Sequence, residues 1–171
     1  MVRFALPILL AFAGPVAAQS ACGADPTAWL AENGPAMDGF WTDDMMVFIM
    51  NGEAMPTNPP EVVPVATIPG GLRVEALEGE ITYDLMLTDR GFDLEPPPGV
   101  LPVTGAEFEL LAFDCPVDQL PRLLSQQQVV LDGLPVQLTV SGVIADTQTI
   151  HLFFNMEMSF GTIQQYSVMS Q

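Results

Sequence analysis

Apolar and polar residues alternate along much of this chain, and that alternation limits the folds open to it. In three segments nearly every second side chain is apolar, at 81–88, 134–144 and 151–160. Successive side chains of a β-strand point to opposite faces, so a period of two gives a sheet one apolar face. Weaker alternation, typical of further strands, occurs at 72–78, 107–113, 127–131 and 162–169.

Turn-forming residues separate these segments. Asp132-Gly133 lies between two apolar strands and is the strongest hairpin signal, and Gly79 and Gly161 mark two further turns. About eight short strands with one apolar face each are typical of an antiparallel barrel or sandwich. We therefore expect a mainly β fold, a small antiparallel β-barrel or alternatively a β-sandwich, in a single β-rich domain over residues 19–171.

Two short helices are expected beside the sheet. Asp25-Pro26 has the pattern of a helix N-cap followed by proline at the first helical position, and Asn33-Gly34 predicts the end of that helix. A short mid-chain helix is expected within residues 115–125, CPVDQLPRLLS. Two proline-rich segments, 56–64 and 95–102, lack backbone donors for a central strand and are expected to be loops or edge segments.

The chain begins with the pattern of a secretory signal peptide. Arg3 precedes an apolar run that ends near Phe12, and Val16 and Ala18 suit signal peptidase. We expect cleavage near Ala18, which would remove residues 1–18 and make the protein periplasmic or secreted. The apolar run is too short to span a bilayer and no later stretch is long enough, so no membrane span is expected.

Two cysteines, Cys22 and Cys115, would remain after cleavage. In an oxidising compartment, an even pair in a small exported domain predicts a disulfide. A loop of that length, about 90 residues, would add about 4–5 kcal/mol on the chain-entropy model. Acylation of Cys22 in a lipoprotein is the alternative, although Gln19 stands where such signals prefer leucine or a branched side chain.

The charge balance is strongly acidic, with 21 acidic residues against four arginines and lysines together. Such a surface repels phosphate backbones and anionic head groups, so we expect no nucleic-acid binding and no electrostatic membrane docking. The acidic residues are scattered rather than grouped in blocks, which favours an interpretation as a solubilising surface.

Gly39-x-Trp41 follows the predicted N-terminal helix and directly precedes the β-rich part of the chain. This tripeptide resembles the opening motif of lipocalins, in which the tryptophan plugs the closed end of an eight-stranded up-and-down barrel. The resemblance implies a small apolar ligand in the barrel mouth. Without it, Trp41 is interpreted as a buried core residue.

A ligand inside such a barrel would contact aromatic and sulfur-containing side chains on the inward rows. The residues expected to bind it are Trp41, Phe48, Tyr83, Phe154, Met156 and Met158.

A cluster of methionines suggests an alternative, copper, because thioethers are soft ligands suited to Cu(I). The best subset is Met45, Met46, Met50 and Met55. On a regular strand Met46 and Met50 share a face with Phe48, while Met45 points away. His151, the only histidine, has the opposite parity to Met156, so a regular strand separates the two. Packing of flexible methionine against aromatic neighbours explains most of the cluster without metal.

Enzymatic activity is not expected. A lone histidine supplies neither a zinc site nor, without a Gly-x-Ser-x-Gly elbow, a recognisable triad. Paired carboxylates such as Asp84 with Glu109 leave a carboxylate-dependent hydrolase as a distant alternative. The leading hypothesis is an exported, non-catalytic binding or accessory protein without a cofactor, which holds a small apolar molecule or contacts an envelope protein.

Overall fold

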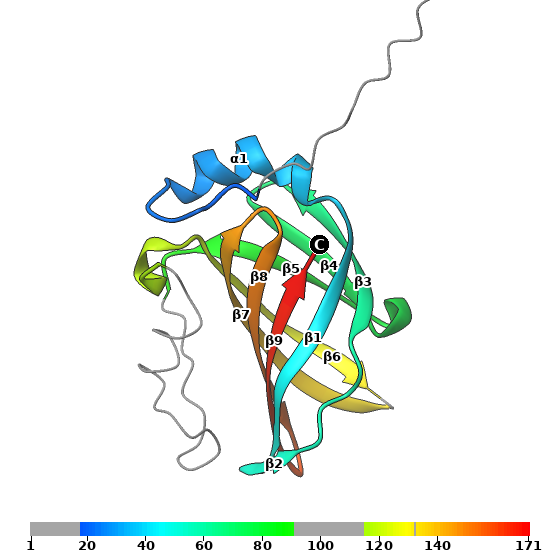
Figure 1. Ribbon diagram of the computed structural model, residues 1–171. Helices are drawn as coiled ribbons and strands as arrows, with labels where there is room; N and C mark the ends of the chain where they lie inside the picture. The colour runs from blue at the N-terminus through cyan, green and yellow to red at the C-terminus, as the bar shows by residue number, and fades with distance from the viewer. Residues whose placement is uncertain (1–17, 91–114, 132) are drawn as a thin grey trace, which may run out of the picture.

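The computed structural model describes residues 18–90, 115–131 and 133–171. In these ranges nine antiparallel strands form one sheet in the order β2-β1-β3-β4-β5-β6-β7-β8-β9, and β1 also pairs with β9. That additional pairing closes eight of the strands into a barrel, with β2 as an extra strand alongside β1 (Figure 1). The predicted mainly β fold is confirmed, and the chain adopts the barrel and not the sandwich.

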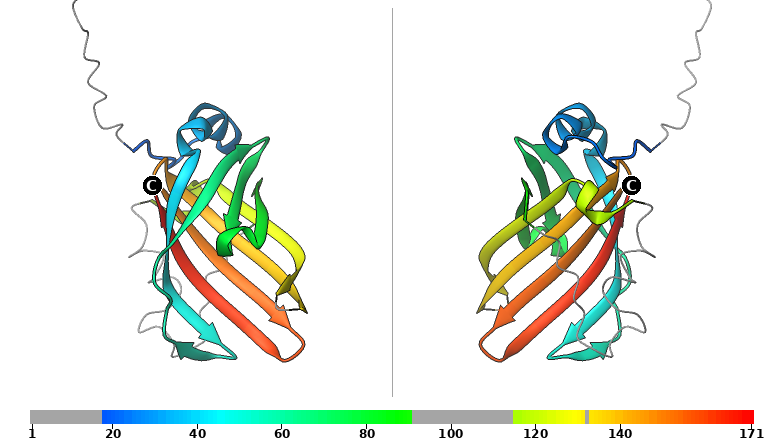
Figure 2. Two further views of the ribbon diagram at one scale, coloured as in Figure 1. Left: turned by 90° about the vertical axis from the view of Figure 1, so that its right-hand side faces the viewer. Right: turned by 90° about the vertical axis from the view of Figure 1, so that its left-hand side faces the viewer.

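The strands of the barrel differ in length. Their bounds are β1 (Gly39–Met50), β2 (Glu53–Met55), β3 (Glu61–Ile68), β4 (Gly71–Ala76), β5 (Ile81–Thr88), β6 (Arg122–Leu131), β7 (Leu134–Asp146), β8 (Thr149–Met158) and β9 (Gly161–Ser170). The β1–β3 ladder ends at Asp43↔Glu61, whereas β1 continues beside β9 as far as Met50. Strands β6 to β9 therefore run past the ends of β3 to β5 on one side of the molecule (Figure 2).

Helix α1 (Pro26–Met37) lies across one end of the barrel (Figure 1). Its N-cap is Asp25 as predicted, because the Asp25 carboxylate accepts a hydrogen bond of 2.8 Å from the backbone N–H of Ala28. The predicted end at Asn33-Gly34 is wrong. Gly34 instead allows α1 to pack closely against β3. Its carbonyl accepts a hydrogen bond from the Thr67 hydroxyl (2.6 Å), and a Cβ at Gly34 would collide with the Thr67 side chain.

Most of the predicted inward rows form the core, whereas Leu134 and Phe160, at the ends of two rows, are exposed. Ile81, Tyr83 and Leu85 of β5 are all buried, as are alternate residues of β7 and β8. The largest fully buried side chains of the described residues include Trp41, Met37, Leu72, Leu85, Leu123, Ile144, Ile150, Leu152 and Met169. Most of these side chains lie toward the end that α1 covers, so the barrel is filled with apolar side chains at that end.

The mid-chain segment contains less helix than its sequence suggested. A 3-10 turn covers only Val117–Gln119, and β6 begins at Arg122, so Leu123 reaches the core from a strand. Of the proline-rich segment 56–64, residues from Glu61 onward join β3. Pro64 pairs there with β1 alone, because the β3–β4 ladder begins at Val65.

A disulfide joins Cys22 to Cys115, with 6.0 Å between the Cα atoms and 93 residues of separation. The predicted bond is confirmed, and it fits an oxidising compartment. It leaves Cys22 no thiol for the alternative of acylation. The bond ties the segment before α1 to the segment before β6.

Several predictions fall on residues that the structure does not describe. The proline-rich segment 95–102, the weak strand 107–113 and almost all of the predicted signal peptide, 1–18, lie outside the described ranges. Within the described ranges, none of the helices has the length and apolar character needed to cross a bilayer.

Candidate ligand site in the barrel

A cavity of about 110 Å³ lies inside the barrel, away from α1. It is bounded by β1, β7, β8 and β9 on one side and by the ends of β3, β4 and β5 on the other. The cavity exists because β3, β4 and β5 are short. The longer strands β1 and β6 to β9 continue past their ends, where β3 to β5 supply no side chains to fill the interior. We call this half of the barrel the open half, and the half around Trp41 beneath α1 the closed half.

Aromatic and thioether groups form the apolar wall of the cavity. The rings of Tyr83 and Phe154 meet edge to face, with their centroids 5.9 Å apart. Met45, Leu138 and Met156 line the same space. Such an arrangement suits the apolar body of a small molecule.

The six residues predicted to bind a ligand divide into two groups. Tyr83, Phe154 and Met156 line the cavity. Trp41 lies instead in the closed half, fully buried, and its indole N–H donates a hydrogen bond of 2.7 Å to the carbonyl of Met37. Phe48 and Met158 have inward parity on β1 and β8, but neither lines the cavity.

Met45 lies on the inner face of β1, four residues after Trp41 and two after Asp43, and a β-bulge follows it. The register of β1 against β9 shifts between Met45 and Val47, so that Met46 is an extra residue. Met45 therefore shares the inner face with Phe48, and the prediction that it points the other way is wrong. The other methionines of the predicted copper subset are exposed: Met46 (54%), Met50 (37%) and Met55 (40%).

Asp43 also belongs to this site, although it is not among the six residues expected to bind a ligand. It lines the cavity, and its Oδ1 atom is buried without a hydrogen-bond partner. Burial raises the pKa of Asp43 from 3.8 to about 6; the Ser167 hydroxyl opposes that rise, and the charges of Glu61 and Asp44 add to it. The alternation of side chains along β1 could have identified Asp43, since it lies two residues after Trp41 on the same inward row.

Further polar groups surround Asp43. Ser167 is fully buried and accepts a hydrogen bond of 2.8 Å from the side-chain amide of Gln165, which also lines the cavity. Burial, together with the charges of Asp43 and Glu61, raises the pKa of Tyr83. The cavity therefore combines an apolar wall with a carboxylate-rich side, and within the described ranges no lysine, arginine or histidine lines it.

His151 lies on the outer face of the barrel. Its Nδ1 atom is 2.8 Å from the Tyr166 hydroxyl, and the two rings stack. Burial lowers the pKa of His151 to about 4, against a smaller opposing effect of Asp146. In β8 its parity is opposite to that of Met156, as predicted. Across the described part of the chain, no three His, Cys, Asp or Glu side chains gather as a metal site.

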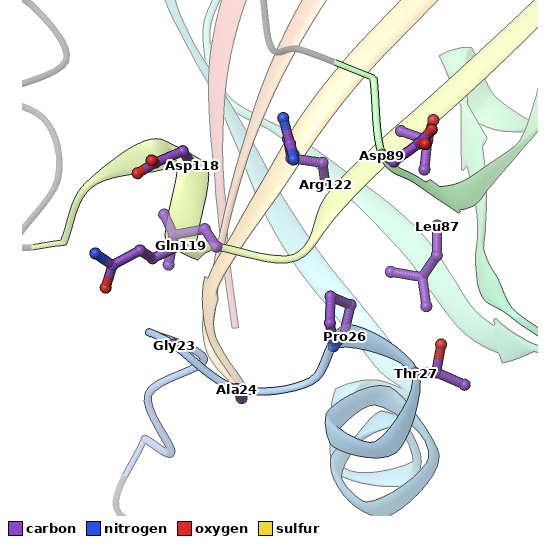
Figure 3. Close-up of a pocket in the computed structure, with 11 residues that line it drawn as sticks. Gly23, Ala24, Pro26, Thr27, Leu87, Asp89, Asp118, Gln119 and Arg122 are labelled. Atoms are coloured by element: carbon purple, nitrogen blue, oxygen red, sulfur yellow. The ribbon is translucent and has the colours of Figure 1, made fainter.

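A larger depression, about 540 Å³, lies outside the barrel (Figure 3). It is bounded by the segment from Gly23 to Thr27, the end of β5 and the turn before β6. Most of its side chains, including Asp89, Asp118 and Gln119, are solvent-exposed. This depression is a shallow part of the surface and carries no buried polar atom without a partner, so the inner cavity is the stronger candidate.

Exposed apolar side chains surround the open end of the barrel. They lie at the ends of strands and in the turns of that end: Met50, Met55, Leu77, Val130, Leu134 and Phe160. Each is between 37% and 71% exposed. The cavity is therefore reached past an apolar rim.

Together these features define a closed, eight-stranded antiparallel barrel with one filled half and one hollow half. The chain matches no protein-family model, and no curated protein or solved structure is significantly similar to it.

Proposed function

We propose that this chain is an exported, lipocalin-like binding protein that holds a small, largely apolar molecule in the open half of its barrel. The observation that carries the proposal is the inner cavity lined by Met45, Tyr83, Phe154 and Met156. Export is supported by the N-terminal apolar pattern and by the Cys22–Cys115 disulfide.

The size of the cavity limits the ligand. At about 110 Å³ it is smaller than the 300–1,000 Å³ typical of pockets for drug-sized molecules. Either the ligand is small, or one end of a longer molecule enters while the rest lies on the apolar rim. The closed half already has its own apolar core, so the fold does not depend on the ligand for stability.

Two other functions have weaker support. The exposed apolar side chains at the open end favour contact with an envelope protein, because exposed apolar groups occur at many interaction sites. Copper is the other alternative, and its support is that the thioethers of Met45 and Met156 line one cavity. A Cu(I) competition titration without uptake would remove the copper alternative.

The test is native mass spectrometry of the protein purified from its own periplasm. We expect a chain that begins near residue 19, with its disulfide intact and a small organic molecule retained. An Ala76→Phe variant fills the edge of the cavity and should lose that molecule. Glu75→Phe adds the same ring at the neighbouring, exposed position and should retain it.

Other results would contradict the proposal. A bare polypeptide that also fails to bind hexan-1-ol at millimolar concentration would exclude a ligand carrier. Retention of a protein partner in its place would favour the accessory function, and a copper adduct would favour the methionine site.

A further inference from the structure

We propose that the ligand carries an alkylammonium group whose N–H donors bind the Asp43 carboxylate, while its apolar part packs against Tyr83, Phe154 and Met45. The inference rests on the proposed function, which it makes more specific by naming the chemical class of ligand. It is argued from one unpartnered atom, from the charges around it and from the wall of the cavity.

The Oδ1 atom of Asp43 is the first observation. More than nine-tenths of buried polar groups in proteins have a hydrogen-bond partner, and a buried acceptor without one is costly. Asp43 Oδ1 is the buried side-chain oxygen that lacks a partner among the described residues. It lies on the wall of a cavity with room for a donor, so a ligand can supply the missing hydrogen bond.

The charges near Asp43 determine which donor fits. Glu61 lines the same cavity and Asp44 is adjacent in the chain, and both add negative potential at Asp43. Arg73 is bound to Asp84 on the exterior at 2.7 Å, and Arg90 hydrogen-bonds to Gln126. No cationic side chain of the described ranges lines the cavity or lowers the pKa of Asp43, so a cationic ligand is attracted to the Asp43 carboxylate and an anionic one is repelled.

The aromatic wall adds a second preference for a cation. Tyr83 and Phe154 lie beside the carboxylate side of the cavity, and an ammonium group is attracted to the face of an aromatic ring. The thioether of Met45 and the side chain of Leu138 suit the alkyl part of the same molecule. An organic ammonium therefore uses both sides of the cavity at once.

A metal ion fits this lining less well. Calcium takes six to eight oxygen ligands and magnesium requires nearly ideal octahedral geometry. The cavity offers oxygens from Asp43, Glu61, Asn58 and Gln165, but much of its remaining lining is aromatic or aliphatic. Such a wall contacts apolar groups and offers no hydrogen bonds to the water molecules that would complete the coordination shell of a metal ion.

The test compares three six-carbon probes of nearly equal size: hexylamine, hexan-1-ol and hexanoate. Each is titrated into the purified mature protein at pH 8 by isothermal titration calorimetry or by NMR shifts of the Tyr83 and Phe154 rings. A charge-assisted hydrogen bond predicts at least about tenfold tighter binding of hexylamine than of hexan-1-ol. Hexanoate should bind more weakly than either.

Asp43→Asn and Asp44→Asn are the matched variants. Both remove one carboxylate, but only Asp43 lines the cavity, while Asp44 is exposed on the other face of β1. Asp43→Asn should reduce the preference for the amine to less than about twofold and leave the affinity for hexan-1-ol nearly unchanged. Asp44→Asn should retain most of the preference.

Acidification provides a second measurement. The pKa of Asp43 is about 6, so the carboxylate is largely protonated at pH 5 while hexylamine keeps its charge. The preference for the amine should therefore fall between pH 8 and pH 5. Three other titratable groups face or adjoin Asp43: Glu61, Asp44 and Tyr83. The variant Glu61→Gln is included to separate the contribution of the Glu61 carboxylate from that of Asp43.

Three results would overturn the inference, and they differ in which proposal they leave standing. Equal binding of hexylamine and hexan-1-ol by the wild type would exclude an ammonium ligand and retain an apolar-ligand carrier. Failure of all three probes to bind would contradict both proposals. A preference for the amine that survives Asp43→Asn would also exclude the assigned role of Asp43.

Discussion

The closed and open halves of the barrel use their polar groups differently. In the closed half, the indole N–H of Trp41 donates to Met37 and that of Trp29 donates to Ser20, at 2.7 and 3.1 Å, and the Asn33 amide donates to Trp29 at 3.0 Å. In the open half, Asp43 Oδ1 is buried and has no partner. The closed half satisfies these polar groups by itself, whereas the open half leaves one buried acceptor, which the proposed ligand would satisfy.

The contrast has a structural cause in the strands. The short strands β3 to β5 lie beside the longer strands only in the half of the barrel near α1. There every strand contributes side chains to the interior. Farther along β1, Met45 lies on the inner face just before the bulge at Met46 and lines the space that the short strands leave. We therefore expect substitutions in the closed half to change the free energy of unfolding, and substitutions in the open half to change ligand binding.

The largest expected effect is loss of the Cys22–Cys115 disulfide, which anchors the chain on the closed side. Replacing both cysteines with serine removes a constraint over 93 residues and should lower the free energy of unfolding by about 4 kcal/mol. Urea denaturation at pH 7 measures the change. The affinity of the folded variant for hexan-1-ol should stay within about twofold of wild type; a larger loss would mean that the two halves are coupled.

Trp41→Ala should lower the free energy of unfolding by about 3–5 kcal/mol, because it leaves a large space in a filled core. Phe40→Ala is the control, since Phe40 adjoins Trp41 in β1 but is 73% exposed. It should change stability by no more than about 0.5 kcal/mol. Comparable losses in the two variants would contradict the assignment of Trp41 to the closed core.

Asp43→Asn should have the opposite sign and raise stability at neutral pH. The pKa of Asp43 is higher in the folded protein, about 6, than the ordinary value of 3.8. The folded state therefore favours the protonated form, and stability that is present below pH 3.8 is lost as the pH rises through 6. At pH 8 the variant should gain on the order of 1–3 kcal/mol, and the gain should vanish near pH 4.

Thermal or urea unfolding across pH 4–8 measures this gain, with Asp44→Asn as the control. Asp44 is exposed, so its substitution should have a small effect at every pH. A loss of stability in Asp43→Asn at pH 8 would show that the carboxylate is already satisfied in the empty protein. That result would remove the contrast between the two halves.

The period of two was enough to predict much of the fold. It identified the inward rows of β5, β7 and β8 because strand parity is a local property. Closure of the barrel is different, since it depends on pairing of β1 with β9 near the other end of the chain. Residues 81–88 and 134–144 have the same pattern in a sandwich, so the sequence left both folds open.

The candidate site was only partly predictable from the sequence. Tyr83, Phe154 and Met156 follow from parity. Met45 was assigned to the wrong face because its position was counted relative to Phe48, and the bulge between these two residues inserts one residue and reverses the faces beyond it. Asp43 was treated as one of many solvated carboxylates, although its position on the row of Trp41 was visible. In a chain with many carboxylates, the sequence alone does not separate those that line a cavity, such as Asp43 and Glu61, from those on the surface.

The smallest expected effect concerns His151, on the outer face of the barrel. As the only histidine, it gives an unambiguous imidazole signal in NMR titrations. Burial lowers its pKa to about 4, so the folded state binds fewer protons than the unfolded state between pH 4 and 6.5, and this group favours folding more as the pH rises. The sign is opposite to that of Asp43, and in the wild type the two contributions offset each other in part near pH 5.

Asp43→Asn should leave the titration midpoint of His151 unchanged and make its effect on stability visible. Asp43 faces the interior, whereas His151 packs with Tyr166 outside, where the charge of Asp146 acts on it. The variant should therefore lose stability on acidification from pH 6.5 to 4 more steeply than the wild type does. A midpoint that shifts by a full pH unit would instead mean that the inner carboxylate acts through the barrel wall, and the open half could not then be treated as a separate binding unit.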